Sequence, residues 1–263
     1  VDGLSIGEGL IWAVRDPIEQ TTPIKERGRY TGEYETTIID QGITDKRLLV
    51  LEPEFASVLK VMGREGNTLS PILRRAWDTG TLRTLTKNSP AVATGAHVSI
   101  LAHITKEELL RHLTESEADN GFANRFLWIC VRRSKKLPEG GGKPEYSRLV
   151  APLHEALEKA RTLGHLSRDM DAKEVWAAIY PDLSDGKPGL LGAVTARAEA
   201  QVLRLSVLYA AMDGSDFIRL PHLRAALAVW DYSAASARFI FGDATGDSIT
   251  DRIMDALRNG ELD

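Results

Sequence analysis

The stretch Leu48-Leu49-Val50-Leu51-Glu52-Pro53-Glu54 decides how the fold is interpreted, because it joins four consecutive apolar residues to two carboxylates. The charged residues 45–47 precede the apolar run. A run this short, with such abrupt ends, is typical of a strand that is buried on both faces. The sequence therefore predicts a core strand that carries Glu52 and Glu54 at its carboxyl-terminal tip.

Two short helices are predicted directly after this strand. Apolar residues recur at intervals of three and four over residues 55–62 and, after a polar break at 63–67, over residues 69–76. A buried strand followed by amphipathic helices favours an α/β fold.

A hairpin and a second core strand are predicted further along the chain. Segments 82–86 and 91–94 flank the turn-rich Lys87-Asn88-Ser89-Pro90, as expected for a hairpin. Residues 97–103 alternate and then become apolar, which predicts a strand that ends at His103. Thr105 followed by Glu108 is a capping box and predicts the start of a helix.

A third apolar strand is predicted over residues 126–131. It contains Cys130, the only cysteine of the chain, so a disulfide within the chain is impossible and a thiol buried in a strand is expected. The basic, glycine-rich residues 132–142 then predict a linker. Helices are predicted after it over residues 154–163, 172–180, 195–212, 221–241 and 248–258.

The amino-terminal residues 3–10, GLSIGEGL, contain the G-x-S-x-G pattern of serine hydrolases. A nucleophile elbow needs strands before its serine, and Ser5 followed by Glu8 also forms a capping box, so the start of a helix is favoured over a nucleophile. Residues 19–41 are polar and predict a long exposed loop that could include a short strand over 34–39.

Composition excludes several classes of protein. The net charge is −4 and the isoelectric point about 5.9, so the whole molecule lacks the basic field of a bulk nucleic-acid binder. The six histidines lack zinc-site spacing, and no apolar run reaches the length of a membrane span. We expect a cytoplasmic protein. Because the chain starts at Val1 and ends at Asp263 after one helix, we also expect an excised fragment.

The order of these elements resembles the second half of a P-loop ATPase core of the AAA+ and replicative-helicase type. The stretches SIGEGLIWAVRDP, LLVLEPEFASVLKVMGREGNTLS, AWDTGTLRTLTKN, HVSILAHIT and NGFANRFLW look more closely like a phage- and plasmid-borne family whose members are often labelled DNA primase or helicase. The resemblance covers roughly Leu4 to Phe241. It implies an α/β fold with a partial P-loop NTPase (RecA/AAA+-like) sheet over residues 1–140 and an all-helical lid over 141–245. Residues 246–263 would begin a further segment, for which the resemblance suggests a winged helix.

In the resembled ATPases, one acid at the tip of this strand binds Mg²⁺ and a second activates the attacking water. The resemblance assigns Glu52 to the metal and Glu54 to the water. The sequence departs from the family pattern, because glutamate replaces aspartate and Pro53 is inserted. The competing interpretation is a pair of solvated carboxylates that cap the next helix.

The resemblance assigns nucleotide-sensing and trans-acting roles to polar residues elsewhere. His103 matches a sensor of the γ-phosphate, although a histidine packed at a strand end explains it equally well. Arg125 matches an arginine finger that enters a neighbouring subunit's site, with a structural ion pair to Glu117 or Asp119 as the alternative.

Two further assignments concern the lid and the hairpin. Arg197 and Arg204 lie on one stripe with Gln201 and match the second sensor of the helical lid, although a solvated polar face is equally consistent. Lys87 at the hairpin tip matches a DNA-tracking residue in the central channel of a ring. Its alternative is an ordinary surface lysine.

The resemblance implies an ATP- and Mg²⁺-dependent translocase or helicase that acts on DNA, single-stranded DNA above all, as a ring-shaped homo-oligomer in phage or plasmid replication. The chain contains no G-x-x-x-x-G-K-[ST] motif, so we expect it neither to bind nor to hydrolyse ATP by itself. One rival is a catalytically inactive DNA-binding or scaffolding module of the same fold. The other is a serine hydrolase that uses Ser5.

Overall fold

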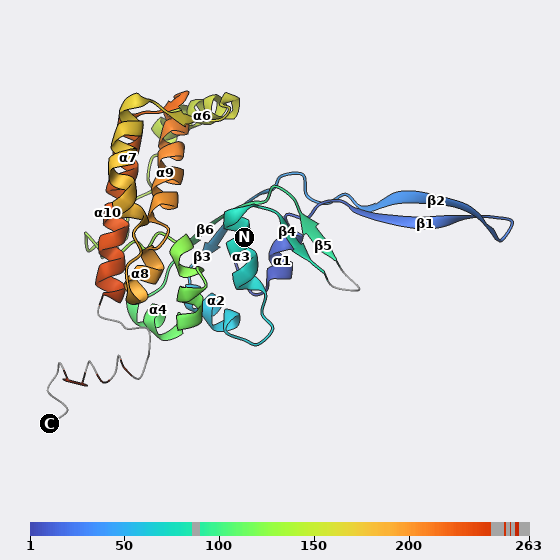
Figure 1. The fold of residues 1–263 in the computed structure, drawn as a ribbon, viewed down its shortest axis with the longest axis horizontal. Coiled ribbons are helices and arrows are strands. Elements are labelled where there is room, and N and C mark those ends of the chain that lie inside the picture. Colours follow the sequence, from blue (N-terminus) through green and yellow to red (C-terminus); the bar gives the residue numbers. More distant parts are fainter. Residues whose placement is uncertain (86–89, 243–249, 251–252, 254–255, 258–263) are drawn as a thin grey trace. The chain divides into compact units, whose positions relative to one another are not determined.

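The computed structural model describes residues 1–85 and 90–242, with residues 250, 253, 256 and 257 near the carboxyl terminus. The chain divides into two compact units, Val1–Phe122 and Ala123–Asp263 (Figure 1). This division lies earlier in the chain than the boundary that we expected at residue 140. The molecule is a mixture of helices and small sheets, which agrees with an α/β class in general terms.

The centre of the first unit is a parallel pair of strands. β3 (Arg47–Glu52) pairs with β6 (His97–Ala102), with Glu52 opposite Ala102. On the opposite edge of β3, the amino group of Val1 donates to Leu49 O (3.0 Å), and Leu51 N donates to Val1 O (2.8 Å). This bonding is that of a parallel neighbour, so backbone partners occupy both edges of β3.

Only one face of this pair is covered. Val50 is fully buried, whereas Leu49 is 56% exposed and Leu51 47% exposed. The prediction of burial on both faces was therefore wrong. Side chains alternate between the two faces, and within the described residues only the face that carries Val50 is packed.

The helices of the first unit follow the sequence pattern closely. α2 (Phe55–Met62) and α3 (Leu69–Asp78) confirm the two predicted helices. β4 (Leu82–Thr84) and β5 (Ala91–Ala93) confirm the hairpin. α4 (Lys106–His112) begins where Thr105 Oγ1 accepts a hydrogen bond from Glu108 N, as the capping box predicted, and α5 (Glu115–Asp119) follows.

The capping box predicted at Ser5 is wrong. α1 (Gly7–Ala13) begins after Ile6 without a side-chain cap. Thr68 instead supplies the contacts, because its Oγ1 accepts from Gly7 N (3.1 Å) and donates to Glu8 Oε2 (2.8 Å). A Cβ at Gly7 would lie 2.6 Å from Ile72, so glycine is needed where α1 meets α3.

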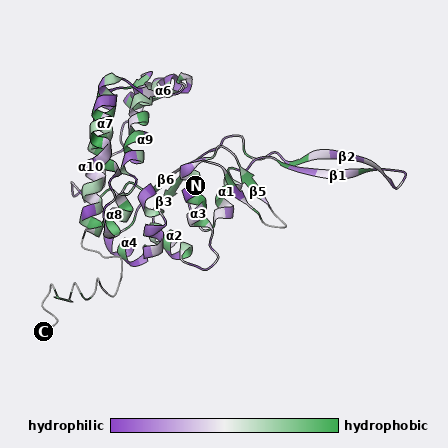
Figure 2. Ribbon diagram, viewed as in Figure 1, coloured by the Kyte–Doolittle hydropathy of each residue, from purple (hydrophilic) through white to green (hydrophobic). Residues whose placement is uncertain are grey.

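Residues 18–40 are the largest departure from prediction in this unit. They form an antiparallel hairpin of β1 (Ile18–Glu26) and β2 (Arg29–Asp40), which we call the arm. Hydrophilic and hydrophobic residues both lie along its strands (Figure 2). Nearly every side chain is exposed, so neither face packs on a core, and the alternation that reveals a half-buried strand is absent.

The second unit is built mainly from helices. A 3₁₀ turn, η1 (Ala123–Arg125), precedes α6 (Ser147–Thr162), α7 (Met170–Ser184), α8 (Gly189–Thr195), α9 (Ala198–Met212) and α10 (Leu220–Phe241). The strands β7 (Ser167–Arg168) and β8 (Phe217–Ile218) form one short parallel pair, so the unit is not entirely helical. Its core joins α7, α9 and α10 through Ala172, Ala198, Val202, Leu223, Ala226 and Trp230.

The strand predicted over residues 126–131 is wrong. This apolar segment has no regular secondary structure and is bonded to α10 by side chains. Cys130 N donates to Ser236 Oγ (3.1 Å), and Tyr232 Oη donates to Cys130 O (2.6 Å). Cys130 is accordingly only half-buried, and not in a strand.

Most of the helix predicted over residues 248–258 lies outside the described residues. Within the part of the chain that the structure covers, no helix is long and apolar enough to cross a bilayer.

Candidate functional site

The carboxyl edge of the β3–β6 pair brings three of the predicted site residues together. His103 N donates to Glu52 O (2.9 Å), and Phe55 N donates to His103 O (2.9 Å). The backbone of His103 is thereby held between the end of β3 and the start of α2. The backbones of Glu52 and Glu54, predicted from one segment, and of His103, predicted from another, thus lie at one sheet edge, where α/β sheets bind ligands.

Glu52 is the buried member of this group. It is 6% exposed, and its Oε1 accepts a hydrogen bond from Leu4 N at 2.6 Å. It is therefore not the solvated carboxylate of the competing interpretation. To bind a cation, its carboxylate would have to share or release the Leu4 amide.

Glu54 is exposed and lies at the N-cap position of α2. This position agrees with the competing interpretation of a solvated carboxylate at the start of the next helix, although the side chain makes no capping hydrogen bond. Because it is exposed, the Glu54 carboxylate is also accessible to water and could accept a proton from it.

His103 is also exposed, directly after β6. Strand alternation places its side chain with exposed Leu101, on the face opposite to Val50 and Glu52. The structure thus brings the backbones of Glu52 and His103 together and directs their side chains to opposite faces. The alternative of a packed histidine at a strand end does not hold.

The second unit brings two of the predicted arginines to one junction. Arg125 ends η1, and Arg197 is the N-cap residue of α9. Asn124 connects these elements, because its Nδ2 donates to Ala193 O in α8 and its O accepts from Gln201 Nε2, both at 3.3 Å. η1 therefore packs against the α8–α9 junction, next to Arg197.

The polar stripe of α9 is not uniform. Gln201 is 5% exposed and has a structural role through Asn124, whereas Arg204 is exposed and Arg197 half-buried. The interpretation as a solvated face therefore fails for Gln201. α9 starts at Ala198, so Arg197 precedes the first turn and does not lie within it.

The structure does not place Lys87 or Ser5 in a functional site. Lys87 lies outside the described residues. Ser5 is exposed, its carbonyl accepts from Asn67 Nδ2 (2.8 Å), and in the described part of the chain no histidine is hydrogen-bonded to its hydroxyl. The Ser5 region lacks the geometry of a nucleophile elbow. Glu117, named as a partner of Arg125, accepts the Ser70 hydroxyl.

No group of three or more metal-ligating side chains occurs among the described residues. Mg²⁺ in nucleotide sites is commonly held by one or two carboxylates together with substrate phosphates. Glu52 and Glu54 could supply such carboxylates, but not a site formed by protein ligands alone.

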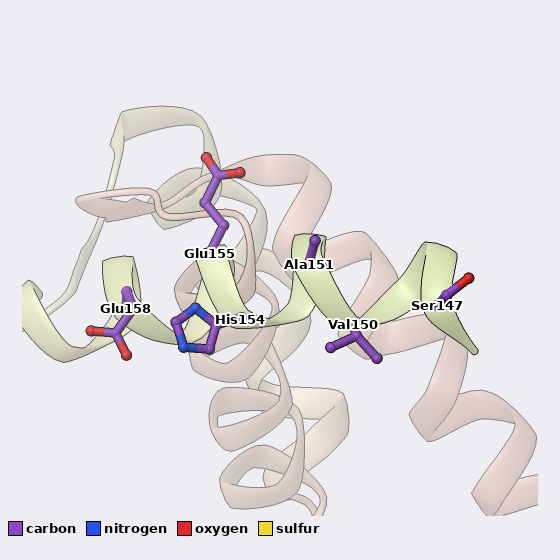
Figure 3. A pocket seen from close by; sticks show the side chains of 6 residues that line it. All are labelled: Ser147, Val150, Ala151, His154, Glu155 and Glu158. Atoms are coloured by element: carbon purple, nitrogen blue, oxygen red, sulfur yellow. The ribbon is translucent and has the colours of Figure 1, made fainter.

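The hollows of the second unit do not form an alternative site. One is lined from a single helix, α6, by the residues labelled in Figure 3, and a single helix cannot enclose a ligand. Another, of about 370 Å³, lies between α7, α8 and α10. Its charged residues have both signs, with Asp182, Asp185 and Asp231 beside Lys187 and Arg238, and favour no ligand class.

The base of the arm holds a polar network that no sequence pattern predicted. Arg15 binds Asp40 through two nitrogens (2.8–3.1 Å) and stacks on Trp12, with Cζ 4.0 Å from the ring centroid. Lys46 Nζ donates to Asp16 Oδ1 (2.7 Å) and to the carbonyls of Val14 and Arg15. These contacts fasten the start of β1 and the end of β2 to the body of the unit.

Both carboxylates of this network are acidified. Burial would raise the pKa of Asp16, but hydrogen bonds from Lys46 and Thr94 outweigh it and hold the pKa below its usual value. Hydrogen bonds from Arg15 and then from Gly42 N lower the pKa of Asp40. Both groups therefore remain ionised at any pH near neutrality.

Comparison with models of known protein families gave no match, and a search of curated proteins also found none.

Proposed function

We propose that this chain is part of an ATP-dependent DNA translocase or helicase of the P-loop type, which acts in phage or plasmid replication as a ring-shaped homo-oligomer. The observation that carries the proposal is the meeting of Glu52, Glu54 and His103 at the carboxyl edge of two parallel strands. Ligands of α/β sheets bind at the carboxyl ends of the strands, and phosphoryl transfer uses acids that hold Mg²⁺ and position the attacking water, so the place of these residues in the fold supports the proposal.

In the proposed site, Glu54 orients and deprotonates the attacking water. Its carboxylate suits this role because it is exposed and makes no capping hydrogen bond to α2. Glu52 would hold Mg²⁺ after release from Leu4 N, and the metal would neutralise charge on the phosphates. His103 would sense the γ-phosphate, for which its side chain would have to turn from the opposite face of the pair.

Arg125 is proposed to act on the site of a neighbouring subunit, with Arg197 and Arg204 as the sensing arginines of the helical unit. This part of the proposal is supported by the two hydrogen bonds of Asn124, to Ala193 and Gln201, which hold η1 against the start of α9. A guanidinium matches phosphate oxygens in shape and charge. Lys87 is proposed to contact DNA from the tip of the β4–β5 hairpin.

The test is ATP turnover, with and without single-stranded DNA, in a longer polypeptide that supplies a phosphate loop, since this sequence contains none. Glu54→Gln should lower turnover at least about a hundredfold, as expected for loss of a catalytic base. Glu65→Gln, at another exposed glutamate of the same unit, is the matched control and should leave turnover unchanged. Equal turnover in both variants would contradict the role of Glu54.

Arg125→Ala tests the shared site separately. Mixing this variant with Glu54→Gln should restore part of the turnover, because each protein would complete the site that the other lacks. Absence of complementation in an assembled oligomer would remove Arg125 from the mechanism.

A second candidate function is a DNA-binding or scaffolding module without catalysis. The burial of Glu52 and its bond to Leu4 N favour it, because an acid engaged by the protein's own backbone is poorly placed to bind a metal. An intact polypeptide that binds DNA without hydrolysing ATP would support this candidate.

A further inference from the structure

The arm carries all of its cations at one end. Lys25, Arg27 and Arg29 are the only basic residues within 18–40, and all lie within five positions at the turn between β1 and β2. In the part of the chain that the structure describes, none of the three forms an ion pair. The five tip residues hold three cations and one carboxylate, Glu26, so the tip has a net positive charge on an otherwise acidic protein.

The turn presents this charge in an unusual conformation. Arg27 has φ +48° and Gly28 has φ +80°, the signs that a two-residue type I′ turn requires. Asparagine or glycine is preferred at the first of these positions, and Arg27 is the only described residue other than glycine with a positive φ. Arg27 thus occupies a position where turn chemistry favours another residue.

The two faces of the arm differ. One face carries Tyr30, Tyr34 and Ile38 of β2. Their cross-strand partners on the same face are, in that order, Lys25, Pro23 and Glu19 of β1. Lys25 Nζ lies 4.6 Å from the centroid of the Tyr30 ring. The other face carries Arg29 together with Glu26, Glu33 and Glu35. Aromatic rings beside a lysine are typical of surfaces that contact bases and phosphates. On the other face, Arg29 at the tip is the only cation, and the carboxylates of β2 lie further along the strand.

The shape of the arm matches a nucleic acid as well. A two-stranded ribbon is of a size that the major groove admits, and the nine residues of β1 span about 30 Å, more than the groove's width. An isolated hairpin is marginally stable in water, so an arm that buries neither face is expected to gain order from a partner.

We infer that the tip of the arm binds the sugar–phosphate backbone of a nucleic acid through Lys25, Arg27 and Arg29. The choice of nucleic acid over another polyanion rests on the proposed function. Binding at the tip requires no bound ATP. The tip lies between β1 and β2, whereas the candidate ATPase site lies at the carboxyl edge of β3.

The experiment measures binding of the 263-residue chain to fluorescent oligonucleotides, single-stranded and duplex, as a function of salt. Replacing the three cations together by Lys25→Gln, Arg27→Asn and Arg29→Gln should weaken binding at least about tenfold and reduce the salt slope by about three, one for each lost phosphate contact. Asparagine suits the type I′ turn, so this variant keeps the hairpin.

The matched control removes the same charge elsewhere in the unit, by Lys60→Gln, Arg64→Gln and Arg111→Gln at exposed positions. It should retain the affinity of the unchanged protein. Equal weakening in both triple variants, or tighter binding to anionic lipid vesicles than to either oligonucleotide, would overturn the inference. So would an unchanged protein that binds neither oligonucleotide.

The single-stranded and duplex probes identify the form of nucleic acid. If the triple variant weakens binding only to the duplex, the arm inserts into a groove, and Tyr34→Ala should then change the affinity little. Loss confined to the single strand supports stacking, and Tyr34→Ala should then weaken binding severalfold. Failure of ATP turnover in the longer polypeptide would leave these binding results unaffected, so the two proposals fail separately.

Discussion

The β3–β6 pair and the arm are both two-stranded, yet they are stabilised in different ways. β3 buries Val50 completely, and backbone partners lie on both of its edges. The arm buries neither face and is held by ion pairs at its base and a tight turn at its tip. The comparison separates strand stability that comes from hydrophobic burial from stability that comes from polar anchoring.

The largest difference is expected when a buried side chain is removed beside the candidate site. Phe55 is 1% exposed at the start of α2, and Phe55→Ala should lower the free energy of unfolding by about 3–5 kcal/mol. Tyr34→Ala on the arm, at a residue 70% exposed, should change it by no more than about 0.5 kcal/mol. Urea denaturation measures both, and similar losses would show that the arm shares the core.

A smaller effect is expected from a backbone change at the base of the arm. Gly42 has φ +67°, and an added Cβ would lie 2.6 Å from the backbone of Asp16 and Pro17. Gly42→Ala should therefore destabilise the unit by about 2–3 kcal/mol. Gly28→Ala at the tip, where nothing lies within 4 Å, should cost only about 1 kcal/mol. Thermal denaturation compares the two variants. Equal decreases in Tm would contradict the close packing of Gly42 at the base of the arm.

The polar anchoring also predicts a pH dependence for the arm. The folded-state pKa values of Asp16 and Asp40 are lowered, so their contribution is complete above the ordinary aspartate pKa of about 3.9. It is lost as the pH falls below that value through the folded-state pKa values. Amide hydrogen exchange at pH 6 and pH 3 should show protection lost earlier in the arm than in β3. Asp40→Asn should already lack part of this protection at pH 6.

The smallest effect is expected at the turn, and its sign is opposite. Arg27→Asn relieves a positive φ that asparagine tolerates, so it should stabilise the arm by a few tenths of a kcal/mol to about 1 kcal/mol. Slower amide exchange in β1 and β2 would confirm the gain. Faster exchange would mean that Arg27 contributes to folding of the arm.

The same comparison explains which elements the sequence could predict. Helices with one packed face leave a period, so α2 and α3 were predicted correctly, and the Thr105 cap of α4 was predicted from its capping box. The apolar run of β3 predicted a strand correctly but not which of its faces is covered. The arm leaves no period, because both of its faces are exposed. The pair Arg27-Gly28 between segments rich in threonine and isoleucine was the available signal.

The candidate site was predictable in position but not in detail. That Glu52, Glu54 and His103 share one edge follows from their places at the ends of strands. The bond from Leu4 N to Glu52 joins residues 48 positions apart and has no local pattern. The segment 126–131 was misassigned because its hydrophobicity reflects packing on α10, where the Ser236 hydroxyl bonds its backbone in place of a neighbouring strand.

Arg15 offers a way to observe the arm without a label. One guanidinium stacks on the indole of Trp12 and binds Asp40 at the end of β2. Anything that moves the end of β2 also disturbs the surroundings of this half-exposed ring. Trp12 is therefore an intrinsic fluorophore at the point where the arm is anchored, and a Trp12→Phe variant would isolate its emission from that of the other four tryptophans.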